Sequence, residues 1–81
     1  MNHMDTYNRI RSGLRLAIAQ QLRGTGWTQT EIARFLGTSQ TRVSLLMTGA
    51  DEMFSIDALM KMVDPLGLVI DINIHPGRGT K

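Results

Sequence analysis

Apolar positions that recur every three or four residues predict a long first helix between Asp5 and Arg23. Two glycines follow Arg23 and would end it. Gly13 falls inside this stretch, at a cost of about 1 kcal/mol relative to alanine. Either the helix begins nearer Ser12, or a neighbouring element approaches closely at Gly13. The residues expected to face the core are Ile10, Leu14, Ala17, Ile18 and Leu22.

The next stretch, WTQTEIARFLGTSQTRVSLLMTG, predicts two short helices joined by a tight turn. Thr28 is a candidate N-cap, and Glu31, three residues later, would complete a capping box. Gly37 supplies a residue that adopts the left-handed conformation at a helix end. Thr38 or Ser39 can then cap the following helix. We expect Trp27 to lie in the core, at the position of a hydrophobic staple.

The two short helices have an inward and an outward side. The inward residues are Ile32, Ala33, Leu36, Val43 and Leu46, with Met47 at the edge. On the second helix, the opposite face comprises Thr41, Leu45 and Thr48, flanked by Arg42 and Ser44. Isolated helices of this length are marginal in water, so the pair needs a scaffold.

A loop follows Gly49, and Phe54 is expected to enter the core. Ser55 can cap another helix, which should end near Val63 because Pro65 disfavours helical geometry before it. The apolar face of this helix comprises Ile56, Leu59, Met60 and Val63.

The hydrophobic period changes to two between Leu68 and His75, which predicts a half-buried strand. One face consists of Leu68, Ile70, Ile72 and Ile74. A single strand leaves its backbone groups unpaired, so we predict that a second copy pairs with it antiparallel in a homodimer. Packing of helices is the alternative dimer interface. Residues 1–4 are expected to be flexible and residues 76–81 disordered, which leaves one domain over residues 5–75.

Charge is distributed unevenly, although the net charge is only +2. Residues 1–45 contain six arginines against two acidic residues, whereas residues 46–81 contain three basic and five acidic residues. A basic first half favours phosphate binding, although scattered solvent-exposed arginines would give the same count. The 81 residues include no cysteine and no apolar run long enough to span a membrane, so we expect one small cytoplasmic domain. No catalytic, cofactor or metal site is predicted, because His3 and His75 stand apart from any carboxylate pair or nucleophile motif.

The helical pair also carries a recognisable motif: Gln29, then Ile32-Ala33, Leu36-Gly37, Ser39-Gln40, Val43-Ser44, Leu46 and Gly49. This pattern resembles the lambda-repressor-like (Xre or Cro-C1 type) helix-turn-helix family. The resemblance implies a mostly α fold of four to five helices, to which the period-two segment would add one C-terminal β-strand paired across a dimer. It also implies that the second helix of the pair enters the major groove of double-stranded DNA.

The resemblance assigns roles to individual residues. It implies that Gln29 bonds a phosphate and braces Gln40, which reads adenine through paired donor and acceptor groups. Arg42 could bind guanine or a phosphate, with phosphate favoured. Leu45 could contact a thymine methyl group or a protein. The other candidate DNA contacts are Ser39, Thr41, Ser44 and Thr48.

Two functional hypotheses follow. The first is a dimeric transcriptional repressor reading a palindromic operator, similar to the antitoxins of HigA-type toxin-antitoxin pairs, with a toxin as a further partner. The second is a protein-protein interaction module on the same fold, with DNA binding weak or lost. Leu45 supports the second, as do Asp51 and Glu52, which would repel DNA if they faced it. An enzyme is not expected.

Overall fold

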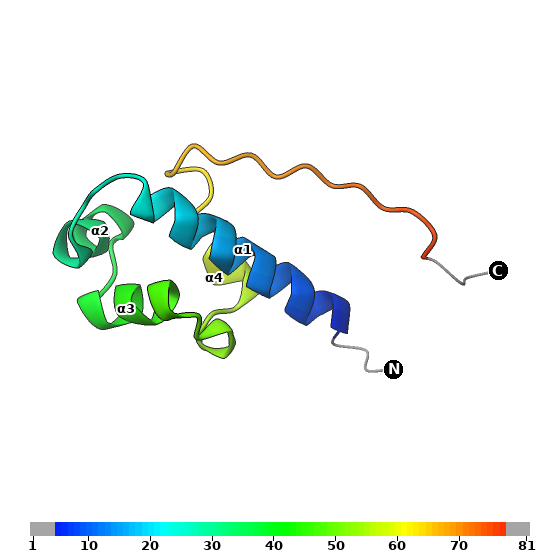
Figure 1. Ribbon diagram of the computed structural model, residues 1–81, viewed down its shortest axis with the longest axis horizontal. Helices are drawn as coiled ribbons and strands as arrows, with labels where there is room; N and C mark the ends of the chain where they lie inside the picture. The colour runs from blue at the N-terminus through cyan, green and yellow to red at the C-terminus, as the bar shows by residue number, and fades with distance from the viewer. Residues whose placement is uncertain (1–4, 78–81) are drawn as a thin grey trace.

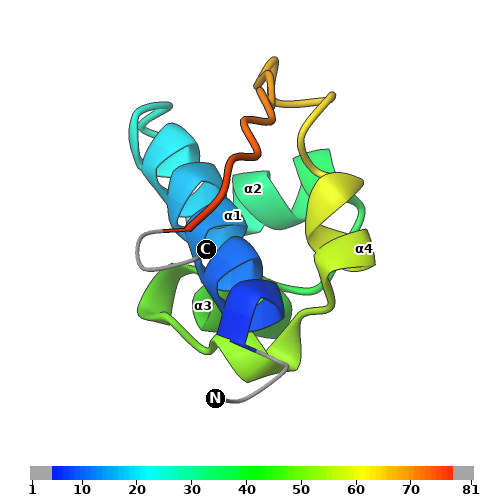
Figure 2. The same cartoon turned by 90° about the vertical axis from the view of Figure 1, so that its right-hand side faces the viewer.

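The computed structural model describes residues 5–77, and their regular structure is entirely helical. The helices are α1 (Asp5–Arg23), α2 (Gln29–Leu36), α3 (Gln40–Thr48) and α4 (Ile56–Met60), with one 3-10 turn, η1 (Asp51–Met53). The long α1 lies across the three shorter helices (Figures 1 and 2). The mostly helical prediction is therefore confirmed for this part of the chain.

Helix α1 is continuous through Gly13. No atom from elsewhere in the described chain lies within 4 Å of the position that a Cβ on Gly13 would take. Both explanations expected for this glycine are wrong for residues 5–77: the helix begins at Asp5, well before Ser12, and no element in this range approaches closely. Packing of the C-terminal half of α1 therefore offsets the weak helix propensity at Gly13.

The turn between α2 and α3 forms as predicted. The Thr28 hydroxyl accepts a hydrogen bond of 3.1 Å from the Glu31 backbone, and the Glu31 carboxylate accepts one of 2.8 Å from the Thr28 backbone. This reciprocal pair is the expected capping box. Gly37 has a φ of 68° and closes α2. Ser39, rather than Thr38, caps α3 by accepting a hydrogen bond from the Arg42 backbone.

The core lies between α1 and the three short helices, and its apolar contacts stabilise their packing on α1. The burial of Phe54, which is 2% exposed, confirms that the loop after Gly49 returns to the core. Met47 lies at the core edge, as expected. The largest fully buried side chains are Ile18, Leu22, Ile32, Val43, Leu46, Phe54 and Leu59.

In α1 and the connection that follows it, three apolar residues expected inside are exposed instead. Trp27 is 40% exposed, and its ring packs on Phe35 with 4.9 Å between centroids. Helix α2 is short and directs Ile32 and Ala33 inward, so Trp27 meets its aromatic neighbour on the outer side. Ile10 and Ala17 are also exposed, because the buried face of α1 is centred instead on residues that include Ile18, Ala19 and Leu22.

The chain after α4 also departs from the prediction. Helix α4 ends at Met60 rather than near Val63, and Met60 is 51% exposed. The amides of Met62 and Val63 bond carbonyls three residues back, which tightens the backbone into turns before Pro65.

The predicted strand is absent from the single chain: residues 68–75 have no regular secondary structure. Figure 1 shows this segment leaving the helices as an extended trace that no other described part of the chain accompanies. A strand requires backbone partners along its length, and among residues 5–77 only the Leu68 amide of this segment has one, the Val63 carbonyl at 3.1 Å. The segment remains strongly apolar, with Val69, Ile72 and Ile74 each at least 80% exposed.

Candidate nucleic-acid interface

The two glutamines of the helical pair begin their helices. Gln29 is the first residue of α2 and Gln40 the first residue of α3, and both side chains are exposed. Backbone N–H groups of a helix's first turn have no intrahelical partner, and the helix dipole makes this end attractive to anions. The amide groups of Gln29 and Gln40 therefore lie exposed at helix ends that attract anions.

Ser39 and Thr41 extend the exposed surface at the start of α3. The Ser39 hydroxyl accepts a bond of 3.1 Å from the Arg42 amide, and its own hydrogen remains available to donate. Thr41 is exposed, whereas Ser44 is half-buried. The first turn of α3 thus presents small polar groups to solvent.

Arg42 is held against the body of the protein. Its guanidinium carbon lies 4.6 Å from the centroid of the buried Phe54 ring, within the range of a cation–π interaction. The guanidinium therefore lies over the face of this ring. The arginine is half-buried, so its position is more restricted than that of a solvent-exposed arginine.

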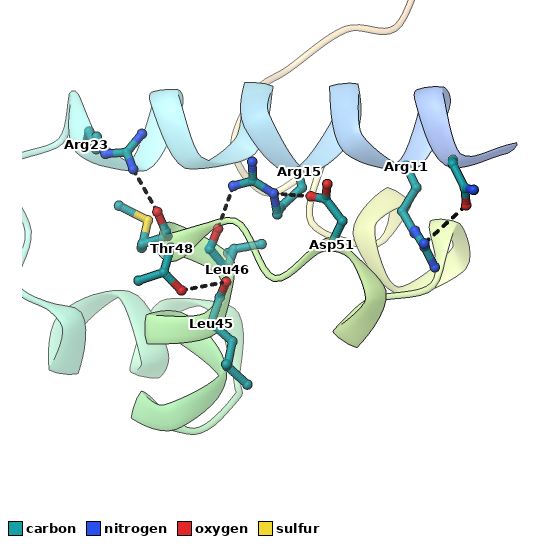
Figure 3. Close-up of polar contacts among 9 residues, drawn as sticks. Arg11, Arg15, Arg23, Leu45, Leu46, Thr48 and Asp51 are labelled. Atoms are coloured by element: carbon teal, nitrogen blue, oxygen red, sulfur yellow. Dashed lines mark hydrogen bonds and ion pairs between the residues drawn. The ribbon is translucent and has the colours of Figure 1, made fainter. Parts of the chain in front are cut away.

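Leu45 does not lie on a fully exposed face, which corrects the expectation from the helical projection. It is half-buried and packs against the core. Its carbonyl accepts a bond of 3.4 Å from the Thr48 hydroxyl (Figure 3). Thr48 is exposed at the last turn of α3, so its side chain is accessible although its hydroxyl bonds within the helix.

Two arginines of α1 bind the C-terminal end of α3 (Figure 3). Arg15 donates a bond of 2.9 Å to the Leu46 carbonyl, and Arg23 donates one of 2.8 Å to the Met47 carbonyl. The last carbonyls of a helix have no partner within it and carry partial negative charge, so cationic donors stabilise this end. The sequence pattern distinguishes neither arginine from the other four of the basic first half, so it does not reveal this role.

Asp51 completes this arrangement. Its carboxylate accepts a hydrogen bond from Nε of Arg15 in an ion pair. The Arg15 hydrogen bond holds the pKa of Asp51 below its usual value; partial burial opposes this, and Ser12 and the Arg11 charge lower the pKa further. Asp51 therefore faces α1 and is compensated there. The expectation that Asp51 and Glu52 act together against DNA applies only to Glu52, which is exposed.

The profile of the helix-turn-helix domain family matches residues 3–75. The chain belongs to this family. No curated protein matches the chain significantly. Membership is consistent with the lambda-repressor-like resemblance and indicates a DNA-binding regulator. The match extends through the segment 68–75, which is thus part of the family domain. No helix among the described residues is long and apolar enough to cross a membrane.

Proposed function

We propose that this protein is a sequence-specific transcriptional repressor that binds a palindromic operator as a homodimer. The observation that carries the proposal is the orientation of α3. Its C-terminal end is bound to α1 through Arg15 and Arg23, while its first turn exposes Gln40 and Thr41. A helix held at one end, with unengaged polar groups at the other, suits insertion of its N-terminal residues into the major groove.

Within this proposal, Gln40 reads a base, and Gln29 and Ser39 bond phosphates. A glutamine side chain can pair with N6 and N7 of adenine at once, which is worth about 1–3 kcal/mol of discrimination. Thr41, Arg42 and Ser44 contribute further contacts, and Thr48 lies toward the sugar-phosphate backbone. Leu45 contributes less to base reading than the pattern predicted, because it packs partly against the core.

The homodimer would form through the segment 68–75. Among residues 5–77, the only backbone partner of this segment is the Val63 carbonyl, which the Leu68 amide bonds. The alternating apolar side chains of the segment are largely exposed. Pairing with a second copy would give the backbone hydrogen-bond partners and would bury part of the exposed apolar surface. Two copies of α3 about 34 Å apart would then reach successive major grooves on one side of the DNA.

The test measures binding of the full chain to a labelled fragment of its own upstream region and to scrambled DNA of equal length, at two salt concentrations. We expect the native fragment to be preferred, and Gln40→Ala to remove that preference by weakening specific binding about tenfold or more. Gln20→Ala, an exposed glutamine on α1, is the matched control and should bind as the unmodified chain does. Equal binding to both fragments would contradict the repressor.

A second candidate function is protein recognition, as the antitoxin resemblance implies. The exposed pair Trp27 and Phe35 favours it, since two adjacent aromatic rings at 40% and 45% exposure are typical of protein-contact surfaces. Under this function, the double variant Gln40→Ala/Arg42→Ala would bind a toxin encoded beside the gene as well as the unmodified chain does. If the protein acts only as a repressor, it would form no complex with that toxin at any protein concentration used for the DNA measurement.

A further inference from the structure

The extended segment already has an inner and an outer side where it leaves the helices. Leu68 is half-buried and packs against the core. Ile70 is 44% exposed, whereas Val69 between them is 83% exposed. Because successive side chains of an extended chain point to opposite sides, Leu68 and Ile70 define the side that faces the domain. Ile72 and Ile74 continue this side by alternation only, because the domain leaves them 80% and 88% exposed.

We infer that two copies pair antiparallel over residues 69–75, with Ile72 of each copy directly opposite the partner's Ile72. This inference rests on the homodimer proposed above and adds the register and the surface that covers the paired segments. Residues directly opposite each other in an antiparallel pair point to the same face. The isoleucines are at even-numbered positions. They therefore share one face of the pair only in registers that place even-numbered residues opposite even-numbered residues of the partner.

Charge excludes the register centred one residue earlier. Centring on Asp71 would place the two Asp71 carboxylates directly opposite each other, and like charges in this position are destabilising. Centring on Ile72 instead places Asp71 opposite the partner's Asn73, whose amide can donate to a carboxylate. It also places Val69 opposite the partner's His75, so no like charges are opposed.

Length separates the remaining registers. Centring on Ile72 pairs all seven residues from 69 to 75, and Pro76, which has no N–H group to donate, falls just outside. Centring on Asn73 would bring Pro76 opposite Ile70 and leave five paired residues. Centring on Ile70 would place Ile74 opposite Leu66, which is only 9% exposed in the turn before the segment. The register centred on Ile72 is the longest that avoids opposing carboxylates.

Helix α1 offers the surface that would cover the isoleucine face. Ile10 is 50% exposed, Ala17 is exposed and Leu14 is half-buried, and their spacing of four and three residues places them along one side of α1. Gln21 continues this side, and its amide donates a bond of 3.4 Å to the Leu66 carbonyl, just before the segment begins. Figure 1 shows the segment extending past α1 from that point, at a distance from the helix that grows toward residue 77. The isoleucines of the paired segments would lie over this side of the two α1 helices.

Single cysteines test the register, because the chain has none of its own. Ile70→Cys, Asp71→Cys and Ile72→Cys are oxidised separately in a glutathione buffer, with the exposed Arg9→Cys as the control for random collision. Directly opposed residues have Cα atoms about 4.5–5.5 Å apart, which suits a disulfide. We expect Ile72→Cys to form the linked dimer at least tenfold faster than the other three. Fastest linkage at residue 70 or 71, or rates equal to that of Arg9→Cys, would overturn the register.

A pair of substitutions tests the covering surface by light scattering across a dilution series. Ile10→Asn should weaken the dimer about tenfold or more. Leu16→Asn removes a residue of similar exposure, 46%, from another side of α1 and should leave dimerisation unchanged. If Ile10→Asn and Leu16→Asn weaken the dimer equally, the proposed role of α1 is overturned. The two proposals can fail separately. If the chain prefers its native DNA but the disulfide forms fastest at residue 71, only the register is contradicted. If the disulfide forms fastest at residue 72 but the chain shows no preference for the native DNA, only the repressor function is contradicted.

Discussion

The guanidinium of Arg15 on α1 donates a hydrogen bond of 2.9 Å to the carbonyl of Leu46 on α3, a residue 31 positions later in the chain. The same guanidinium pairs with Asp51 in the turn that follows α3. Arg23, two turns further along α1, bonds the Met47 carbonyl. Helix α1 thus determines where the last turn of α3 lies, and through it the direction in which the exposed first turn points.

Replacing Arg15 with glutamine should destabilise the domain by about 2–3 kcal/mol. The substitution leaves the Leu46 carbonyl and the Asp51 carboxylate without their charged donor, and bonds to charged groups in partly buried sites are among the stronger ones. Urea unfolding followed by circular dichroism measures the change. Lys61→Gln is the control: its pair with Asp57 spans 3.8 Å between side chains that are 78% and 87% exposed, so the loss should stay below about 1 kcal/mol. Similar losses in both variants would contradict the proposed role of Arg15.

The Arg15–Asp51 pair should also make stability depend on pH on the acid side. The pKa of Asp51 is lower in the folded chain than in the unfolded chain, where it is about 3.9. The ionised carboxylate therefore stabilises the fold above the unfolded-state pKa, and this contribution is lost as the pH falls through the lower folded-state pKa. The difference in unfolding free energy between the unmodified chain and Asp51→Asn should be constant above about pH 5 and shrink below pH 4.

Unfolding of both chains between pH 2 and pH 7 measures this dependence. Asp57→Asn, which removes a carboxylate from the exposed pair with Lys61, is the control and should show a smaller change over the same range. A difference for Asp51→Asn that grows as the pH falls would contradict the depressed pKa.

Local rules were enough to predict the helix-turn-helix. The capping box of Thr28 and Glu31, the left-handed Gly37 and the Ser39 cap each depend on residues within three positions of one another. Phe54 could be predicted because it is a large apolar residue between a loop and a helix cap. The positions of the candidate DNA contacts at the starts of α2 and α3 followed from these boundaries.

Features that depend on distant residues were not predictable in this way. Arg15 resembles any other arginine of a basic helix until the Leu46 carbonyl is placed beside it, 31 residues away. Spacing alone suggested that Ile10 and Ala17 are buried, because the pattern cannot show where neighbouring helices end. Trp27 is bulky and apolar, yet it packs on Phe35 outside the core. The segment 68–75 has the pattern of a strand, but the single chain contains no partner for it among the described residues.

Two glycine substitutions should act in opposite directions. Gly13→Ala places a methyl group inside α1 with no atom from elsewhere in the described chain within 4 Å, so it should stabilise the domain by about 0.5–1 kcal/mol through helix propensity. Gly37→Ala introduces a side chain at a φ of 68°, which should cost about 1–2 kcal/mol. Thermal unfolding of the two variants measures both changes. A destabilised Gly13→Ala would indicate that α1 is contacted at this position in the dimer.

Arg42→Ala should weaken DNA binding in a way that identifies the group it contacts. If Arg42 binds a phosphate, affinity for native and scrambled DNA should fall together, and the slope of log K against log salt should become shallower by about one. If it binds guanine, affinity for the native fragment alone should fall, by about 1–3 kcal/mol. The position of the guanidinium over the Phe54 ring favours the phosphate, because this contact restrains Arg42 and limits its reach into the groove.

Stability must be measured alongside, since Arg42→Ala also removes the contact with the Phe54 ring. That contact should contribute about 0.5–1 kcal/mol, as for partly exposed cation–π pairs. Arg34→Ala is the matched control: Arg34 is an exposed arginine in the last turn of α2, at the opposite end of that helix from Gln29. It should leave the salt slope unchanged. Equal changes of slope in both variants would mean that Arg42 acts through general positive charge rather than through a contact of its own.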